Sequence, residues 1–210
     1  MFYIFRQIVF SFLIFSSVAS AANTIIIVAE EFPRATNTDG TGAQFEIIKA
    51  ILEPYGYNLK FNVFPYKRAI YLTEHNKADI IIGIYEFPTK QLRFAKYPQD
   101  VDKMVAIYPK SSQVNWQGIS TLENKRISAT PGFEASINHA LKNISFQFNE
   151  VSTRTQTLKK LIHHRTDFMI DTEAVYSMEE INIYKSMLDK KNIGFFEIFT
   201  AFANNEKTKV

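Results

Sequence analysis

Residues 24–29 read Thr-Ile-Ile-Ile-Val-Ala, and residues 78–84 read Ala-Asp-Ile-Ile-Ile-Gly-Ile. Short apolar runs rich in β-branched residues are typical of strands that are buried on both faces of a parallel sheet. Between the two runs, residues 43–52 place apolar side chains at helical spacing, residues 59–63 alternate as a strand, and residues 66–75 indicate a second helix. This order predicts a βαβαβ unit with right-handed crossovers.

A second α/β unit is predicted after a connecting strand at 104–108. Two sequences have the form of a helix-capping box, Ser120 to Glu123 and Thr153 to Gln156. The remaining pattern predicts strands at 126–129, 144–148 and 168–170, helices at 133–141 and from 153 onward, and an extended aromatic segment at 192–202.

The two units predict two lobes that the chain connects at least twice, near 104–110 and near 185–195. We expect residues 22–107 together with 190–210 to form lobe 1, and residues 108–189 to form lobe 2.

The composition excludes several classes of protein. The chain of 210 residues has no cysteine, so it holds no disulfide, thiolate zinc site, iron–sulfur cluster or cysteine nucleophile. Hydrophobic residues make up 46% and charged residues 21%, which is typical of a globular protein. The net charge of +3 is small, and we expect no nucleic-acid partner. The histidines follow no metal-binding spacing, and the sequence contains no nucleotide-binding or hydrolase motif, so we expect no metal and no cofactor.

The N-terminus has the pattern of an export signal. Arg6 precedes the apolar run 8–18, and Ala19-Ser20-Ala21 supplies the small residues that a signal peptidase recognises. The run is short for a membrane-spanning helix, which needs roughly 20 residues. We therefore predict a signal peptide at 1–21 that is cleaved after Ala21, with an uncleaved N-terminal anchor as the alternative.

Several short motifs together resemble a known family, the bacterial periplasmic solute-binding proteins of family 3. The motifs follow in order along nearly the whole chain after residue 21: Glu30-Glu31-Phe32-Pro33, residues 42–46 beginning with Gly42, Tyr66 at a helix start, Asp79 before a strand, Pro88-Thr89-Lys90 leading to Phe94, residues 122–132, and Arg165-Thr166-Asp167 with Asp171.

The resemblance implies a type II-like clamshell of two α/β lobes with the ligand cleft between them. It implies a periplasmic, monomeric protein that captures a small polar solute, such as an amino acid or a related amine or acid, for the membrane permease of an ABC transporter. It implies binding without catalysis.

The resemblance also assigns roles to individual residues. Phe32 and Tyr66 match aromatic side chains that flank the ligand, Asp171 matches the acid that accepts its ammonium group, and Lys90 stands where the family usually has a carboxylate-binding arginine. Arg68 or Arg93 could replace that arginine, while Phe133-Glu134 replaces a hydroxyl pair, so an α-amino-acid ligand stays an open question. The expected ligand-binding residues are Glu30, Phe32, Tyr66, Arg68, Tyr85, Lys90, Arg93 and Asp171.

Other interpretations of the same residues stay open. Phe32 and Tyr66 could be core aromatics, and Asp171 could cap a helix at 172–178. Relatives of this fold include dehydratases, in which Glu30 and Glu31 could act as an acid–base pair. A ligand-sensing module for a membrane receptor is the remaining alternative.

Overall fold

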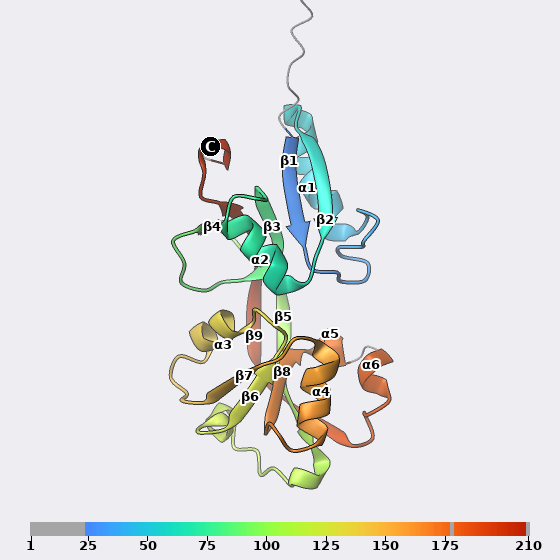
Figure 1. Ribbon diagram of the computed structural model, residues 1–210, viewed down its shortest axis with the longest axis vertical. Helices are drawn as coiled ribbons and strands as arrows, with labels where there is room; N and C mark the ends of the chain where they lie inside the picture. The colour runs from blue at the N-terminus through green and yellow to red at the C-terminus, as the bar shows by residue number, and fades with distance from the viewer. Residues whose placement is uncertain (1–23, 177–178, 209–210) are drawn as a thin grey trace, which may run out of the picture.

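Two α/β lobes stand end to end along the long axis of the molecule, and the strands β5 (Asp100–Pro109) and β9 (Leu188–Ala203) run from one lobe into the other (Figure 1). The structure is a computed structural model that describes residues 24–176 and 179–208. The expected fold class, a two-lobed α/β architecture, is confirmed.

Lobe 1 contains the predicted βαβαβ unit. Strands β2, β1 and β3 are parallel and adjacent in that order, and β9 continues the sheet in the antiparallel direction. Ile80 and Ile82 pack with Phe45 of α1, whereas Ile81 packs with Ala69 of α2, so the two helices cover opposite faces of β3. The elements are β1 (Thr24–Ala29), α1 (Ala43–Leu52), η1 (Glu53–Tyr55), β2 (Asn58–Val63), α2 (Tyr66–Glu74), β3 (Ile80–Tyr85) and β4 (Leu92–Phe94), which pairs with β9.

Lobe 2 repeats this arrangement. Strands β7, β6 and β8 are parallel and adjacent, and β5 joins β8 in the antiparallel direction. Ile127 and Phe168 pack on the face of α3, and Met169 packs with Leu158 and Leu161 of α4 on the other face. The elements are η2 (Lys110–Ser112), η3 (Ile119–Leu122), β6 (Arg126–Ala129), α3 (Glu134–Ala140), β7 (Gln147–Glu150), α4 (Arg154–Ile162), β8 (Phe168–Thr172), α5 (Glu173–Tyr176) and α6 (Glu179–Asn182).

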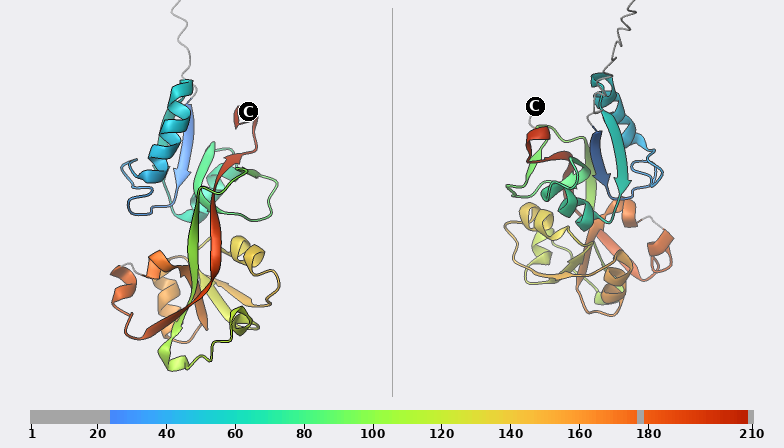
Figure 2. Two further views of the ribbon diagram at one scale, coloured as in Figure 1. Left: turned by 180° about the vertical axis from the view of Figure 1, so that it is seen from behind. Right: turned by 45° about the horizontal axis from the view of Figure 1, so that its top comes forward.

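The lobes are joined by β5 (Asp100–Pro109) and β9 (Leu188–Ala203), which pair along their length (Figure 2, left). Their register shifts between Met104 and Val105, where Gly194 and Asn192 are the partners. The expected lobe boundaries, at 107/108 and 189/190, fall inside these two strands and stay a prediction.

Two local predictions differ from the structure. The second strand of lobe 2 occupies Gln147–Glu150 rather than 144–148, because the chain turns at Leu141, whose carbonyl accepts from the Ile144 amide at 2.8 Å. The capping box at Ser120 is wrong: only a four-residue 3₁₀ turn forms there, and the Glu123 carboxylate instead accepts from the Ser145 amide at 3.0 Å.

Across residues 24–176 and 179–208, no helix has both the length and the hydropathy that a membrane span requires. The predicted signal peptide and the cleavage site after Ala21 lie outside the described residues.

Candidate functional site

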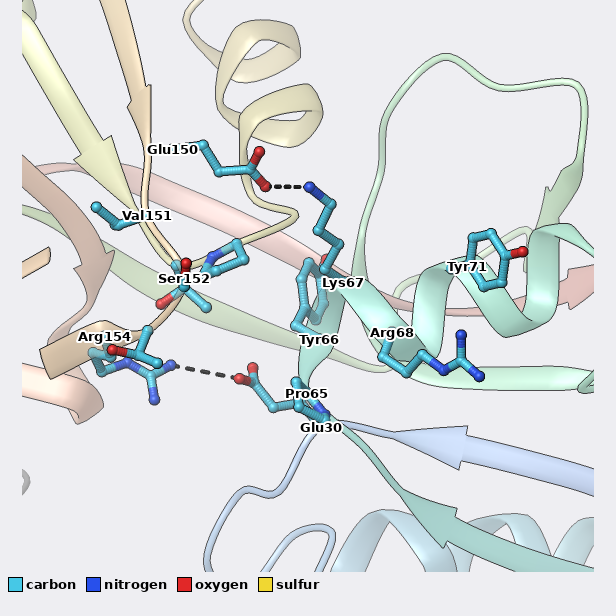
Figure 3. Close-up of a pocket in the computed structure, with 13 residues that line it drawn as sticks. Glu30, Pro65, Tyr66, Lys67, Arg68, Tyr71, Glu150, Val151, Ser152 and Arg154 are labelled. Atoms are coloured by element: carbon cyan, nitrogen blue, oxygen red, sulfur yellow. Dashed lines mark hydrogen bonds and ion pairs between the residues drawn. The ribbon is translucent and has the colours of Figure 1, made fainter. Parts of the chain in front are cut away.

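A cleft of about 730 Å³ lies between the lobes, beside the first turn of α2 (Figure 3). It forms where β1, β6 and β7 end, which is the edge at which open α/β sheets place their ligands. Lobe 1 contributes Glu30, Pro65, Tyr66, Lys67, Arg68 and Tyr71, and lobe 2 contributes Thr130, Pro131 and residues 150–154.

Glu30 and Arg154 face each other across this cleft (Figure 3). Glu30 directly follows β1, and its carbonyl accepts a hydrogen bond from the Thr36 hydroxyl at 2.5 Å, which holds the turn. Arg154 is the first residue of α4, where the Thr153 hydroxyl caps the helix by accepting from the Gln156 amide at 3.2 Å. The distance from Arg154 Nη2 to Glu30 Oε1 is 3.7 Å, and each side chain keeps 20% of its surface exposed.

Asp171 lies behind Arg154 and is fully enclosed. Its Oδ2 accepts from Arg154 Nε at 3.1 Å and from the Thr130 hydroxyl at 3.2 Å, and its Oδ1 accepts from the Thr172 amide at 2.9 Å. The Asp171 side chain has 0% exposure and is not part of the cleft wall. Its carboxylate therefore orients the guanidinium of Arg154 toward Glu30.

The charge of Glu30 depends on this environment. Burial raises the pKa of the Glu30 carboxyl from 4.5 to about 7, the charge of Arg154 opposes that rise, and the charge of Asp171 adds to it. Glu30 therefore changes its charge near neutral pH, and a cationic group in the cleft would favour its ionised form.

A second ion pair spans the cleft. Lys67 Nζ of α2 lies 2.6 Å from Glu150 Oε1 at the end of β7, with 61% and 41% of the two side chains exposed (Figure 3). The two ion pairs lie on opposite sides of the cleft and both join lobe 1 to lobe 2.

A smaller chamber of about 110 Å³ shares Glu30 and Tyr66 with the cleft. The Tyr66 hydroxyl accepts from the Tyr85 amide at 3.1 Å, and the Tyr85 hydroxyl donates to Asp102 at 2.5 Å. Burial raises the pKa of Asp102. Phe32 also lines this chamber.

The structure brings five of the eight expected ligand-binding residues to these two cavities: Glu30, Phe32, Tyr66, Arg68 and Tyr85. It places Asp171 one layer behind the cleft. Tyr66 is a core residue, with 2% of its surface exposed, and it also lines both cavities, while its contact with a ligand stays a prediction.

The structure does not bring Lys90 or Arg93 to the cleft. The Lys90 carbonyl accepts from the side-chain amide of Asn204 at 3.2 Å, and the Arg93 guanidinium donates to the Thr208 carbonyl and lies 5.7 Å from the ring centre of Phe202. Lys90 precedes β4 and Arg93 lies within it, beside β9 and away from the residues that line the cleft.

The sequence analysis missed Arg154 and Thr130. Thr130 directly follows β6, and Arg154 follows β7 at the start of α4. For Arg154 the sequence contains a usable signal, because the capping box at Thr153 marks Arg154 as the first residue of a helix. The family resemblance points instead to a cation near Lys90, in the other lobe.

Within the part of the chain that the structure describes, no three His, Asp or Glu side chains come close enough together to hold a metal ion.

The sequence matches no family model, and no curated protein matches it by sequence. Solved structures match over most of the chain. An amino acid ABC transporter substrate-binding protein, AbpA from Streptococcus pneumoniae, bound to L-arginine, is 18% identical and superposes with a TM-score of 0.62, over 88% of this chain and 83% of that one.

Two further solved structures match to a similar extent. The GluR0 ligand-binding core in complex with L-glutamate is 13% identical with a TM-score of 0.63, over 90% of this chain and 87% of that one. An ancestral amino acid-binding protein, a precursor of cyclohexadienyl dehydratase, is 14% identical with a TM-score of 0.62, over 88% and 83% of the two chains. At these identities the likeness establishes one thing: this chain has the two-lobed α/β fold of amino acid-binding proteins.

Proposed function

We propose that this protein binds a small zwitterionic solute in the cleft between its lobes. The observation that carries the proposal is the Glu30–Arg154 pair, in which each lobe presents one charge and the nearest atoms are 3.7 Å apart. Direct hydrogen bonds between charged groups are shorter, about 2.7–2.9 Å. A solute whose ammonium group meets Glu30 and whose anionic group meets Arg154 would form two charge-assisted hydrogen bonds and bridge the lobes.

The rest of the cleft suits such a solute. Its volume of about 730 Å³ lies within the common range for ligand pockets, about 300–1,000 Å³. Pro65, Tyr66, Pro131 and Val151 supply apolar surface beside the charged groups. In this proposal Glu30 accepts the ammonium group, and Asp171 positions Arg154 instead of contacting the solute.

We further propose that the protein is exported to the periplasm after cleavage behind Ala21, and that it delivers its solute as a monomer to the permease of an ABC transporter. The support is the N-terminal sequence pattern together with the likeness to a transporter's substrate-binding protein. The intact mass of exported protein tests the cleavage, since the chain should then begin at Ala22.

A thermal-shift screen of purified protein against amino acids tests the binding proposal. Each amino acid is paired with an analogue that lacks the ammonium group and one that lacks the carboxylate. At a hundredfold excess over Kd, a true ligand adds about 2.7 kcal/mol of stability, and each analogue should add much less. Stabilisation by both analogues equal to that by the amino acid would overturn the zwitterion assignment, and conversion of the solute would indicate an enzyme.

Variants then test the two charged residues. Glu30→Gln and Arg154→Lys should each weaken binding at least tenfold. The glutamine leaves the ammonium group of the solute without its counter-charge, and the lysine keeps the positive charge but cannot form the planar two-point contact with the anionic group. Lys159→Ala is the matched control, since Lys159 is exposed on the same helix as Arg154 and lies outside the cleft wall. The Lys159→Ala variant should bind the solute with the same affinity as the unmodified protein.

A further inference from the structure

Phe133, which precedes α3 in lobe 2, inserts its ring between two aromatic rings of lobe 1. Its ring centre lies 4.8 Å from that of Tyr66 at 73° and 5.3 Å from that of Tyr85 at 88°. These edge-to-face contacts are a favourable geometry for aromatic pairs. Because Tyr66 begins α2 and Tyr85 ends β3, a side chain of lobe 2 completes an aromatic cluster of lobe 1. Only 3% of Phe133 remains exposed.

The backbone beside Phe133 also lies against lobe 1. Gly132 has a φ of +95°, and a Cβ atom built on it would lie 3.1 Å from Lys67 Cα and 3.2 Å from Lys67 N. Contacts this short are tighter than ordinary van der Waals contact, so a side chain at position 132 would require the backbone at Lys67 to move by a few tenths of an ångström, and a glycine avoids that displacement. One turn later, the Ser136 hydroxyl donates to the Tyr85 carbonyl at 3.4 Å.

These contacts belong to one short segment, 132–136, which we call the latch segment. Phe133 lines the smaller chamber, which shares Glu30 and Tyr66 with the larger cleft, and it is not among the residues that line the larger cleft. The contacts of the latch segment with lobe 1 therefore need no solute, and they leave the larger cleft accessible. Opening the lobes would return Phe133 to water, and the hydrophobic effect opposes that exposure whether or not a solute is bound.

We propose that the latch segment holds the two lobes closed before any solute binds. A protein of this kind exists mainly in its closed state, so the binding of a solute in the cleft shifts the equilibrium between open and closed states only slightly. This inference does not depend on the proposed function, because its test uses protein without solute.

The distance between the lobes can be measured directly, because the chain has no cysteine of its own. Glu53→Cys in lobe 1 and Lys142→Cys in lobe 2, both at exposed positions, would carry spin labels for pulsed electron paramagnetic resonance. Protein is unfolded and refolded beforehand to remove carried-over solute. We expect one distance population, which matches the closed arrangement and does not shorten when solute is added.

Gly132→Ala should shift part of the population to longer distances, because the added methyl group fits only if the Lys67 backbone moves away, which disfavours the closed arrangement. Gly118→Ala is the matched control: Gly118 also lies in lobe 2 with a φ of +87°, but among the described residues no atom comes within 4 Å of a Cβ at that position. It introduces the same backbone strain without the contact, so its lobe distance should stay unchanged.

Phe133→Ala is a second, independent variant, which removes the ring and leaves the backbone unchanged. It should lengthen the distance as well, and Phe133→Leu should lengthen it less because an apolar side chain remains. Circular dichroism identifies any variant that fails to fold. A long distance in the unmodified protein that shortens only with solute would overturn the proposal, as would equal distances in all folded variants.

Discussion

Glu30 is the residue whose charge responds most directly to its surroundings in the cleft. Its pKa in the folded protein is about 7 instead of 4.5, mainly because of burial. The folded state therefore holds the Glu30 proton more tightly than the unfolded state does. The stability that results is fully present below pH 4.5 and is lost as the pH rises through 7.

Glu30→Gln should remove this pH dependence. We expect the variant to be more stable than the unmodified protein above pH 7, by up to about 3 kcal/mol, since a tenfold change in proton affinity corresponds to about 1.4 kcal/mol. Urea unfolding at pH 5, 6, 7 and 8 measures the difference. The exposed neighbour Glu31 supplies the control, Glu31→Gln, which should retain the original pH profile. Parallel profiles for unmodified protein and Glu30→Gln would contradict the argument.

Asp171 is the residue for which the structure changes the expected effect of a mutation. The family resemblance predicts that Asp171→Asn affects solute binding and leaves the fold intact. The structure encloses Asp171 between Arg154, Thr130 and the Thr172 amide, so an amide group there would face donors and leave Arg154 without its counter-ion.

We expect Asp171→Asn to lower the free energy of unfolding by at least about 2 kcal/mol. Removing one partner of a fully buried ion pair usually lowers the free energy of unfolding by about 3–5 kcal/mol. We expect a smaller loss here because the Arg154 side chain retains 20% exposure. Urea unfolding near pH 7 measures the loss, and Asp39→Asn, the same change in an exposed loop, serves as the control. A variant as stable as the control would mean that Asp171 contributes little to the fold.

At the scale of elements, the start of α4 links local stability to the site. Thr153 caps this helix, and Arg154, which reaches Glu30 and Asp171, is the next residue. A frayed first turn would therefore move the guanidinium out of the position that Asp171 gives it.

Thr153→Ala should lower stability by about 1 kcal/mol, the usual cost of losing a capping hydroxyl. It should also weaken solute binding, because the guanidinium of Arg154 loses its fixed position. Thr153→Ser retains a hydroxyl and should restore both properties. Unfolding and calorimetric titration of the two variants provide the measurement. Equal effects of alanine and serine would show that the methyl group, not the cap, is important.

At the scale of the whole molecule, the lobes meet through two kinds of contact, ion pairs and apolar packing. The Lys67–Glu150 pair is largely exposed, and pairs of this kind contribute about 0–1 kcal/mol. Phe133 is buried, and its contact does not depend on salt.

The closed state should therefore persist in 1 M NaCl, where the screening length falls to about 3 Å. Lys67→Ala should lower stability by less than about 1 kcal/mol and leave the lobe distance of the spin-labelled protein unchanged. If high salt or Lys67→Ala separates the lobes, ion pairs rather than apolar packing hold them together.

Most of the fold could be predicted because its signals are local. The apolar run at 24–29 and the helical spacing at 43–52 match β1 and α1 residue for residue. The parallel direction of the strands follows from the same pattern, since buried apolar runs that alternate with helices are typical of a parallel sheet. The capping box at Ser120 failed because of a contact that is distant in the sequence. Its residues have the right types, but the Glu123 carboxylate accepts a hydrogen bond from the backbone amide of Ser145, in another part of the lobe.

The sequence by itself determined two α/β units and their order, because side-chain periodicity is a property of short segments. The positions Glu30, Phe32, Tyr66, Arg68 and Tyr85, which line the two cavities, were expected from the family resemblance. The tertiary structure alone decided that Arg154 faces Glu30, that Asp171 is enclosed and that Phe133 enters the aromatic cluster of the opposite lobe. The enclosure of Asp171 depends on contacts within lobe 2, between β8, α4 and the residue that follows β6. The other two contacts depend on how the two lobes, which β5 and β9 connect, are placed against each other. No spacing along the chain encodes that placement, because it depends on shape and charge matching between surfaces that lie far apart in the sequence.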